Sequence, residues 1–195
     1  ILEYGPGDVP ALALGLVAEG ARNVYCVDRF PLMRLPAFNQ DVLDAMEEGI
    51  GEDAAQDRFR DARARMDSIR DRGAIDPQVP VAYLVDRDGY PRLDGQADLA
   101  LSRAVLEHVN DLAGTFADMF RALRPGGIAL HKVDLRSHGL HRETPLDFLT
   151  WPAWAWWLMH SAKGTPNRWR VDRYRELARE VGFELLLLEP VEQFT

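Results

Sequence analysis

The chain has 195 residues, of which 47% are hydrophobic and 28% charged, and its formal net charge is −8. This length and composition fit one globular domain with a sizeable core. The acidic balance disfavours a nucleic-acid substrate, because phosphate backbones attract basic surfaces. No run approaches the roughly 20 apolar residues of a membrane span, so we expect no transmembrane segment.

The cysteine content bears on the cellular compartment in which the protein works. Cys26 is the only cysteine, so no intrachain disulfide can form, and a reducing, cytoplasmic setting is the simplest expectation. Arginine far outnumbers lysine, which indicates a GC-rich bacterial genome. The chain begins inside a predicted strand, so we expect one domain over residues 1–195, truncated at both ends. The oligomeric state is left open.

The first 28 residues predict a strand–turn–helix–strand unit. Residues 1–4 predict a short buried strand that ends in a glycine-rich turn, and residues 10–19 predict a helix capped by Gly20. Residues 23–28 are rich in β-forming residues and end in Asp28. Such βαβ units are parallel and right-handed.

Residues 31–78 predict a helical insertion. Helices are expected over residues 35–48 and 52–72, and the second mixes acidic and basic residues densely. Such a pattern is typical of a solvated helix with i,i+4 ion pairs. Because the segment is long for a simple crossover, we expect it to cover a substrate site.

The remaining elements alternate between strands and helices. Strands are predicted over residues 79–85, 98–102, 128–133 and 183–188, and helices over residues 110–123, 150–161 and 171–181. Alternation of this kind predicts an α/β fold. We expect a Rossmann-like, doubly wound, mostly parallel sheet of six or seven strands with helices on both faces.

The glycine-rich turn predicts a nucleoside cofactor. Gly5 and Gly7 let a ligand approach the backbone closely, and Asp28 can accept both ribose hydroxyls. NAD-binding turns have a third glycine, which is absent here, and Asp8 would repel a pyrophosphate. The sulfonium and ammonium groups of S-adenosylmethionine (SAM) would instead be attracted by Glu3 and Asp8, so the charge of the loop favours SAM.

Four stretches resemble the motifs of class I SAM-dependent methyltransferases. Residues 2–7, Leu-Glu-Tyr-Gly-Pro-Gly, are similar to the first motif, and Asp28 stands where the family places its ribose-binding acid. Later resemblances follow in the family's order, at residues 97–109, 123–127 and 181–183. The resemblance covers residues 1–30 and 97–188.

The resemblance implies roles for individual residues. It implies that Glu3, Gly5 and Gly7 hold the methionine part of SAM, that Asp28 and Arg29 hold the ribose, that Asp86 contacts the adenine amine, and that Ser102 lies near the reacting methyl group.

Polar residues after the predicted fifth strand are candidates for the acceptor side. Methyl transfer needs an in-line acceptor and often a base, and His131, Asp134 and His138 are the candidate catalytic residues. His138 could act as a base near neutral pH, although each of these residues could also be an ordinary polar contact. Together with His141 they do not show a diagnostic metal spacing, so no metal is expected.

Three further features leave alternatives open. Glu107-His108 is either a second functional pair or a cap for the following helix. The tryptophan-rich residues 151–161 predict core packing, with Trp151, Trp154, Leu158 and Ser161 on one face, or else a lid over the acceptor or a membrane-interface helix. Arg168 and Arg170 are expected either to form salt bridges or to bind an anionic group of the acceptor.

The sequence therefore predicts a SAM-dependent methyltransferase acting on a small-molecule or glycan-type acceptor. A nucleic-acid partner is disfavoured by the acidic charge. A non-catalytic SAM-binding scaffold is the alternative, and an NAD(P)-dependent oxidoreductase is a weaker one.

Overall fold

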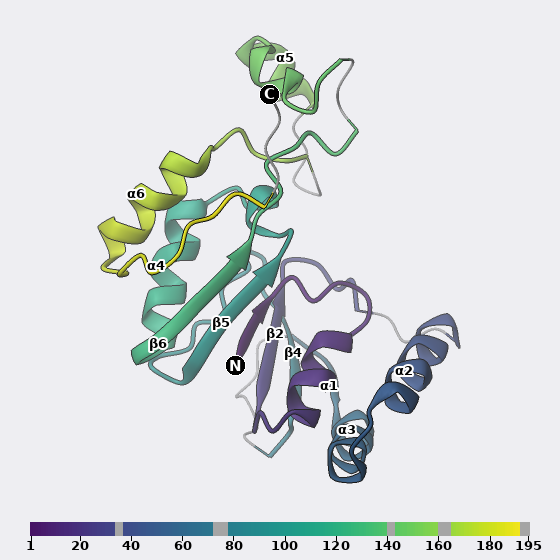
Figure 1. The fold of residues 1–195 in the computed structure, drawn as a ribbon. Coiled ribbons are helices and arrows are strands. Elements are labelled where there is room, and N and C mark those ends of the chain that lie inside the picture. Colours follow the sequence, from purple (N-terminus) through teal and green to yellow (C-terminus); the bar gives the residue numbers. More distant parts are fainter. Residues whose placement is uncertain (34–36, 72–77, 140–142, 160–164, 192–195) are drawn as a thin grey trace. The chain divides into compact units, whose positions relative to one another are not determined.

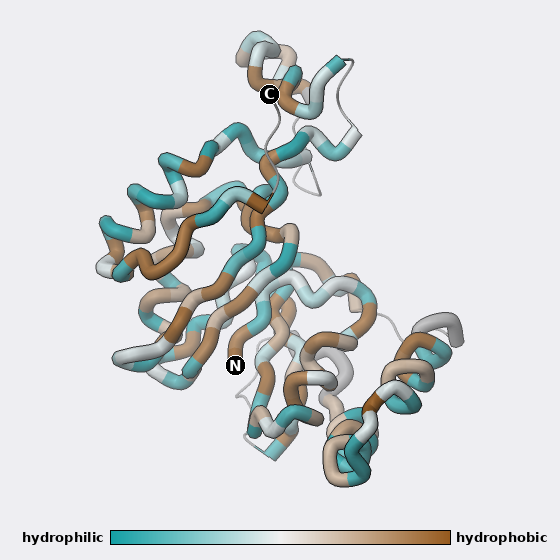
Figure 2. The backbone as a smooth tube through the Cα atoms, in the orientation of Figure 1, coloured by the Kyte–Doolittle hydropathy of each residue, from teal (hydrophilic) through white to brown (hydrophobic). Residues whose placement is uncertain are grey.

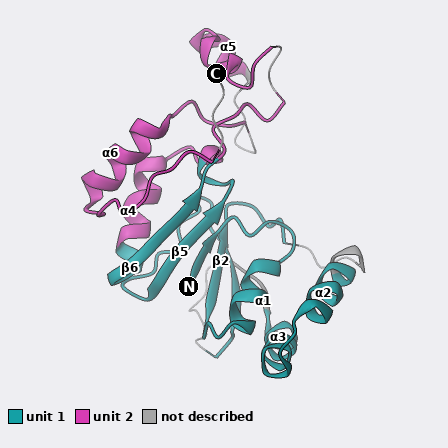
Figure 3. Cartoon of the chain, viewed as in Figure 1, with its two compact units in different colours: residues 1–106, 121–133 teal, residues 107–120, 134–195 magenta. Residues whose placement is uncertain are grey.

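The computed structural model describes residues 1–33, 37–71, 78–139, 143–159 and 165–191. The chain forms two compact units (Figure 3). The first unit comprises residues 1–106 and 121–133, and the second comprises residues 107–120 and 134–195. The sheet belongs to the first unit, and the C-terminal helices belong to the second.

The first unit is built on a six-stranded sheet (Figure 1). Its strands are β1 (Leu2–Tyr4), β2 (Val24–Asp28), β3 (Asp67–Asp71), β4 (Val81–Val85), β5 (Ala97–Arg103) and β6 (Leu123–Lys132). The order is β3-β4-β2-β1-β5-β6, and each neighbouring pair runs parallel. The chain moves outward from β1 and then returns to place β5 on its other side. The Rossmann-like α/β prediction is confirmed, and the strand order reverses between β1 and β5.

Three helices accompany the sheet in this unit: α1 (Ala11–Ala18), α2 (Ala37–Gly49) and α3 (Asp53–Arg65). The side chains of Leu14 in α1 and Phe59 in α3 are fully buried in one cluster with Cys26 and Tyr83 of the sheet. Helix α1 consists of apolar residues, of which Ala13, Leu14, Val17 and Ala18 are buried and Leu12 is exposed. It ends at Ala18, and Gly20, which was predicted to cap it, has a φ of 103° that only glycine readily adopts.

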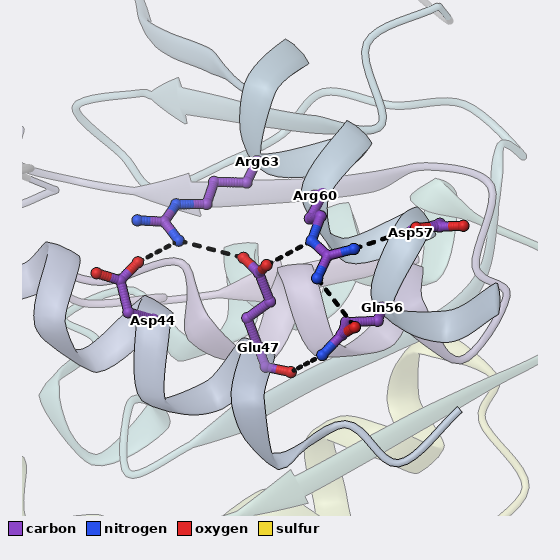
Figure 4. A network of polar contacts seen from close by, with 6 residues as sticks. All are labelled: Asp44, Glu47, Gln56, Asp57, Arg60 and Arg63. Atoms are coloured by element: carbon purple, nitrogen blue, oxygen red, sulfur yellow. Dashed lines mark hydrogen bonds and ion pairs between the residues drawn. The ribbon is translucent and has the colours of Figure 1, made fainter. Parts of the chain in front are cut away.

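The predicted helical insertion is present as α2 and α3, and its charges connect the two helices (Figure 4). Arg60 Nε lies 2.6 Å from Glu47 Oε1, and Arg63 Nη1 lies 2.7 Å from Asp44 Oδ1. Pairs within α3 also occur, such as Arg60 with Asp57. The ion pairs expected along one helix therefore serve in part to join two helices.

The second predicted helix is too long by several residues. Helix α3 ends at Arg65, and Met66 adopts an extended conformation with ψ of 131°. The following residues form β3, which pairs with β4. The sequence pattern alone could not reveal this strand, because its backbone is stabilised by pairing with a distant segment. Residues 34–36 and 72–77 of the predicted insertion lie outside the described residues.

The second unit contains most of α4 (Leu112–Ala122), together with α5 (Ala153–Met159), α6 (Val171–Val181) and the 3₁₀ turn η2 (Asp147–Thr150); a further 3₁₀ turn, η1 (Leu106–His108), crosses the boundary between the units. Helix α6 is confirmed, and Gly182 ends it in the left-handed conformation. The chain then brings Phe183 edge-on against Phe120, with ring centroids 5.1 Å apart. Aromatic packing therefore joins α4 to the segment after α6.

The predicted strand over residues 183–188 is wrong. These residues form no strand in the described part of the chain, and Leu185, Leu186, Leu187 and Leu188 are all exposed. Figure 2 shows them as a hydrophobic stretch after α6. A β-rich sequence becomes a strand only when a neighbour satisfies its backbone groups, and propensity cannot supply that neighbour.

The core-packing interpretation of the tryptophan-rich segment is also wrong for the residues that can be compared. Trp154, Trp157 and Leu158 are 69%, 75% and 66% exposed, whereas Trp156 packs against Phe148 with ring centroids 5.6 Å apart. Ser161 lies outside the described residues. Over the described part of the chain, no helix has the length and apolarity that crossing a membrane requires.

Candidate functional site

The glycine turn after β1 depends on glycine at two positions. Gly5 has φ of 62°, and a Cβ there would lie 2.5 Å from Val105 Cγ2. Its amide donates a 2.9 Å hydrogen bond to Val27 O, which ties the turn to β2. Gly7 has φ of 79°, and no atom lies within 4 Å of where its Cβ would be. The backbone of the turn therefore borders open space at the carboxyl end of β1.

Glu3 lies two residues before the turn and is buried. Cys26 Sγ donates a 3.4 Å hydrogen bond to Glu3 Oε2. Burial raises the pKa of Glu3 to about 7, although this hydrogen bond partly opposes the shift. The carboxyl group is therefore close to its ionisation point at neutral pH, and a nearby cation would favour the charged form.

Asp28 ends β2 at the same edge of the sheet. Its Oδ1 accepts hydrogen bonds from the amides of Arg29, at 2.7 Å, and Phe30, at 3.4 Å. No donor among the described residues hydrogen-bonds to Oδ2. Burial raises the pKa of Asp28, while the two amide bonds lower it. The guanidinium of Arg29 lies over the Phe30 ring, 5.6 Å from its centroid.

Asp86 follows β4 and is already engaged by its own turn. Its Oδ1 accepts hydrogen bonds from the amides of Asp88 and Tyr90, and its Oδ2 lies 3.3 Å from Arg92 Nε. Burial alone would raise the pKa of Asp86, but these amides and the Arg92 guanidinium hold it below its ordinary value. Within the structure its carboxylate shapes the turn after β4.

Ser102 and His131 form a partly buried hydrogen-bonded pair. Ser102 Oγ lies 2.7 Å from His131 Nδ1, across the β5–β6 ladder. Tyr4 of β1 pairs with Ser102 in register, and its ring lies 6.4 Å from that of His131. Burial lowers the pKa of His131 to about 4. His131 is therefore neutral, and it is better suited to orienting Ser102 than to accepting a proton.

His138 and Asp134 belong to the second unit, whereas His131 belongs to the first. His138 Nε2 lies 3.3 Å from Asp134 Oδ2. Arg136 contacts both oxygens of Asp134 and, as the main cause, lowers its pKa to about 2. The sequence grouped His131 with these two residues, but the structure describes only His138 and Asp134 as a pair.

The structure instead places His138 beside Glu107 and His108, the pair whose role the sequence did not decide. His138 Nε2 lies 4.0 Å from Glu107 Oε1, and the rings of His138 and His108 are 4.9 Å apart. The capping interpretation of Glu107-His108 is wrong, because Asp111 caps α4 through a 2.9 Å bond from the Gly114 amide. Burial raises the pKa of Glu107 to about 7, although the backbone amides of Glu107 and Asp134 partly oppose this shift.

Arg168 and Arg170 bind backbone carbonyls within the second unit. Arg168 contacts the carbonyls of Leu149 and Trp151, and Arg170 donates a 2.7 Å hydrogen bond to Leu135 O. These bonds stabilise the loops on either side of α5. A cavity of about 240 Å³ lies beside them, lined by Val109, Asn110, Trp156, Asn167, Arg168 and Trp169.

A sequence profile described as a methyltransferase domain matches residues 1–188. The chain belongs to this methyltransferase domain family. The match spans both the glycine turn and the polar cluster around His138. No curated protein sequence matches the chain.

Solved structures share its fold. One comes from the complex between the Haloferax volcanii Trm112 methyltransferase activator and a methyltransferase candidate, with 18% identity and a TM-score of 0.50 over 93% of this chain and 59% of that one. Another, described as a methyltransferase candidate of Bacillus halodurans, has 16% identity and a TM-score of 0.51 over 94% of this chain and 62% of that one.

A third is phosphoethanolamine N-methyltransferase 2 from Haemonchus contortus, in complex with phosphomonomethylethanolamine and S-adenosylhomocysteine. It has 20% identity and a TM-score of 0.52, covering 93% of this chain and 32% of that one. The present chain thus spans less than two thirds of the length of each of these three proteins.

Proposed function

We propose that the chain transfers a methyl group from SAM to a small-molecule acceptor. The observation that carries this proposal is the glycine turn, where Gly5 packs closely against Val105 and Gly7 leaves the backbone open at the carboxyl end of β1. Ligands of open α/β sheets bind at that edge, where the strand order reverses. Membership of the methyltransferase domain family identifies the class of ligand.

The residues around the turn suit SAM. The amides near Gly5 and Gly7, with the ionisable Glu3, would hold its methionine part, and Asp28 Oδ2 would accept the ribose hydroxyls. Arg29 stands beside Asp28, and Asp86 fixes the turn that would border the adenine. Ser102, held by His131, would border the reacting methyl group. When bound, SAM supplies an electrophilic methyl group on a sulfonium.

Within the second unit, the polar groups around His138 are our candidates for the acceptor chemistry. His138 has a carboxylate partner in Asp134, an arrangement that suits a group that takes a proton from an acceptor hydroxyl or amine. The cavity lined by Trp156, Arg168 and their neighbours combines apolar and polar surface, as small-molecule sites do. Together with the net charge of −8, this favours a small acceptor, including glycan-type metabolites, over nucleic acid.

Two alternatives remain as experimental outcomes. An NAD(P)-dependent oxidoreductase is disfavoured by the family and by the absent third glycine. A SAM-binding scaffold would share every feature of the turn and differ only in turnover.

The buried free thiol of Cys26 supports the cytoplasmic setting expected from the sequence.

Activity separates these alternatives. The protein should transfer a tritiated methyl group from SAM to at least one acceptor in a broad screen of small metabolites, with S-adenosylhomocysteine formed in equal amount. Binding of SAM without transfer to any acceptor would favour the scaffold. Binding of NADH in place of SAM would overturn the proposal.

A further inference from the structure

Three side chains with metal-ligating atoms converge in the second unit. Glu107 and His108 come from η1, and His138 comes from the loop that follows β6. One ligand atom from each lies within 4.8 Å of the others. Ligand atoms around a tetrahedral zinc ion lie roughly 3.4 Å apart, given bond lengths of about 2.0–2.2 Å. Small side-chain rotations would therefore bring this set to coordination distance.

Glu107 is the unusual member of the cluster. Its side chain is only 1% exposed, and neither carboxylate oxygen has a hydrogen-bond donor in good geometry among the described residues, although the backbone amides of Glu107 and Asp134 lie near enough to favour its charged form. Leaving a buried carboxylate without partners is costly, and such groups are normally paired or bound to a metal. His138 Nε2 lies 4.0 Å from Glu107 Oε1.

We propose that Glu107, His108 and His138 bind one divalent transition-metal ion, with Zn²⁺ as the best match. Two imidazoles and one carboxylate form a donor set that zinc uses when its fourth position stays open to water or substrate. Magnesium and calcium prefer oxygen ligands, so imidazole donors disfavour them. The set differs from the one suggested by sequence spacing: of that set it retains only His138, and His141 lies outside the described residues.

The neighbouring groups suit such a site. Arg136 fixes Asp134 beside His138 Nε2, the nitrogen that would bind the metal, so Asp134 is placed to complete the coordination as a further ligand. Val109 and Asn110, the next residues along the chain, line the 240 Å³ cavity. The ion would tie η1 to the loop after β6. With the metal bound, His138 Nε2 is a ligand and no longer a base.

The test uses tag-free protein stripped with a chelator and titrated with Zn²⁺ by calorimetry. We expect one site per chain, and at least about 100-fold weaker binding for Glu107→Gln and for His138→Asn. Gln is isosteric with Glu, and Asn tolerates the φ of 51° at position 138, so both variants should fold. Glu184→Gln, an exposed glutamate of the same unit, is the matched control and should bind as the wild type does.

Two further readouts address folding and geometry. Zn²⁺ should raise the melting temperature of the wild type but not that of Glu107→Gln. Co²⁺ should give the visible absorption of a tetrahedral site, and this should disappear in the same variant. No stoichiometric binding, or equal affinity in the wild type and both variants, would overturn the site. If His138→Asn lowers turnover while Zn²⁺ binding is unchanged, His138 is a base and the metal site is excluded.

Discussion

The glycine turn of the first unit and the Glu107 cluster of the second unit are specified in different ways. At the turn, backbone geometry decides which residue fits, because Gly5 has a positive φ and no room for a Cβ. In the cluster, side-chain charge is decisive, because Glu107 is buried and neither of its oxygens has a hydrogen-bond donor in good geometry among the described residues. The first kind of site can be read from a short motif, whereas the second appears only when distant segments are brought together.

The largest expected effect is on the free energy of unfolding, and it comes from substitutions in the glycine turn, where backbone geometry decides which residue fits. Gly5→Ala should lower the free energy of unfolding by about 2–4 kcal/mol, because it adds both a left-handed strain and an overlap with Val105. Gly7→Ala has the strain without the overlap and should cost only about 1–2 kcal/mol. Urea unfolding of both variants measures the difference.

The control is the double variant Gly5→Ala with Val105→Ala. It should recover part of the loss, because the shorter side chain relieves the overlap. Equal destabilisation by the two glycine variants would contradict the steric account of the turn.

Glu3 should make stability depend on pH. Because its pKa rises from 4.5 to about 7 on folding, the protonated form stabilises the fold at low pH. That contribution is lost as pH rises from about 4.5 through about 7, and it amounts to about 3 kcal/mol at most. Urea unfolding across this range should show the decline in the wild type and not in Glu3→Gln. Parallel curves for the two proteins would show that Glu3 ionises normally.

Asp28→Asn tests the cofactor assignment at the next strand end. Asn keeps an oxygen for the amides of Arg29 and Phe30 but removes the charge. SAM should bind at least about tenfold more weakly, since a hydrogen bond to a charged group contributes roughly 1.5–3 kcal/mol. Asp57→Asn, on the exposed face of α3, is the control in the same titration. Unchanged affinity in Asp28→Asn would remove the ribose assignment.

The smallest effect is expected in the helical insertion. Arg63→Gln removes the ion pairs to Asp44 and Glu47 and should cost about 0.5–1 kcal/mol, because ion pairs that remain partly open to solvent are weak. SAM affinity should not change. A loss above about 2 kcal/mol at low salt, removed by high salt, would show that the network is stronger than its exposure suggests.

The sequence predicted what local rules control. The turn at Gly5 and Gly7, the strand ending at Asp28 and helix α6 all follow from short-range patterns. The strand β3 and the unpaired Phe183–Leu188 segment were mispredicted, because pairing with another strand decides both. The proximity of Glu107 to His138 could not be predicted for the same reason, because it depends on segments that are distant in the sequence. The adjacent residues Glu107 and His108 were nevertheless a usable signal of a functional site.

Calorimetric titration of the purified chain with SAM and, separately, with NADH tests the central claim most directly. The account predicts one saturable SAM site per chain, weakened in Asp28→Asn, and no measurable NADH binding. Saturable binding of NADH without binding of SAM would contradict it.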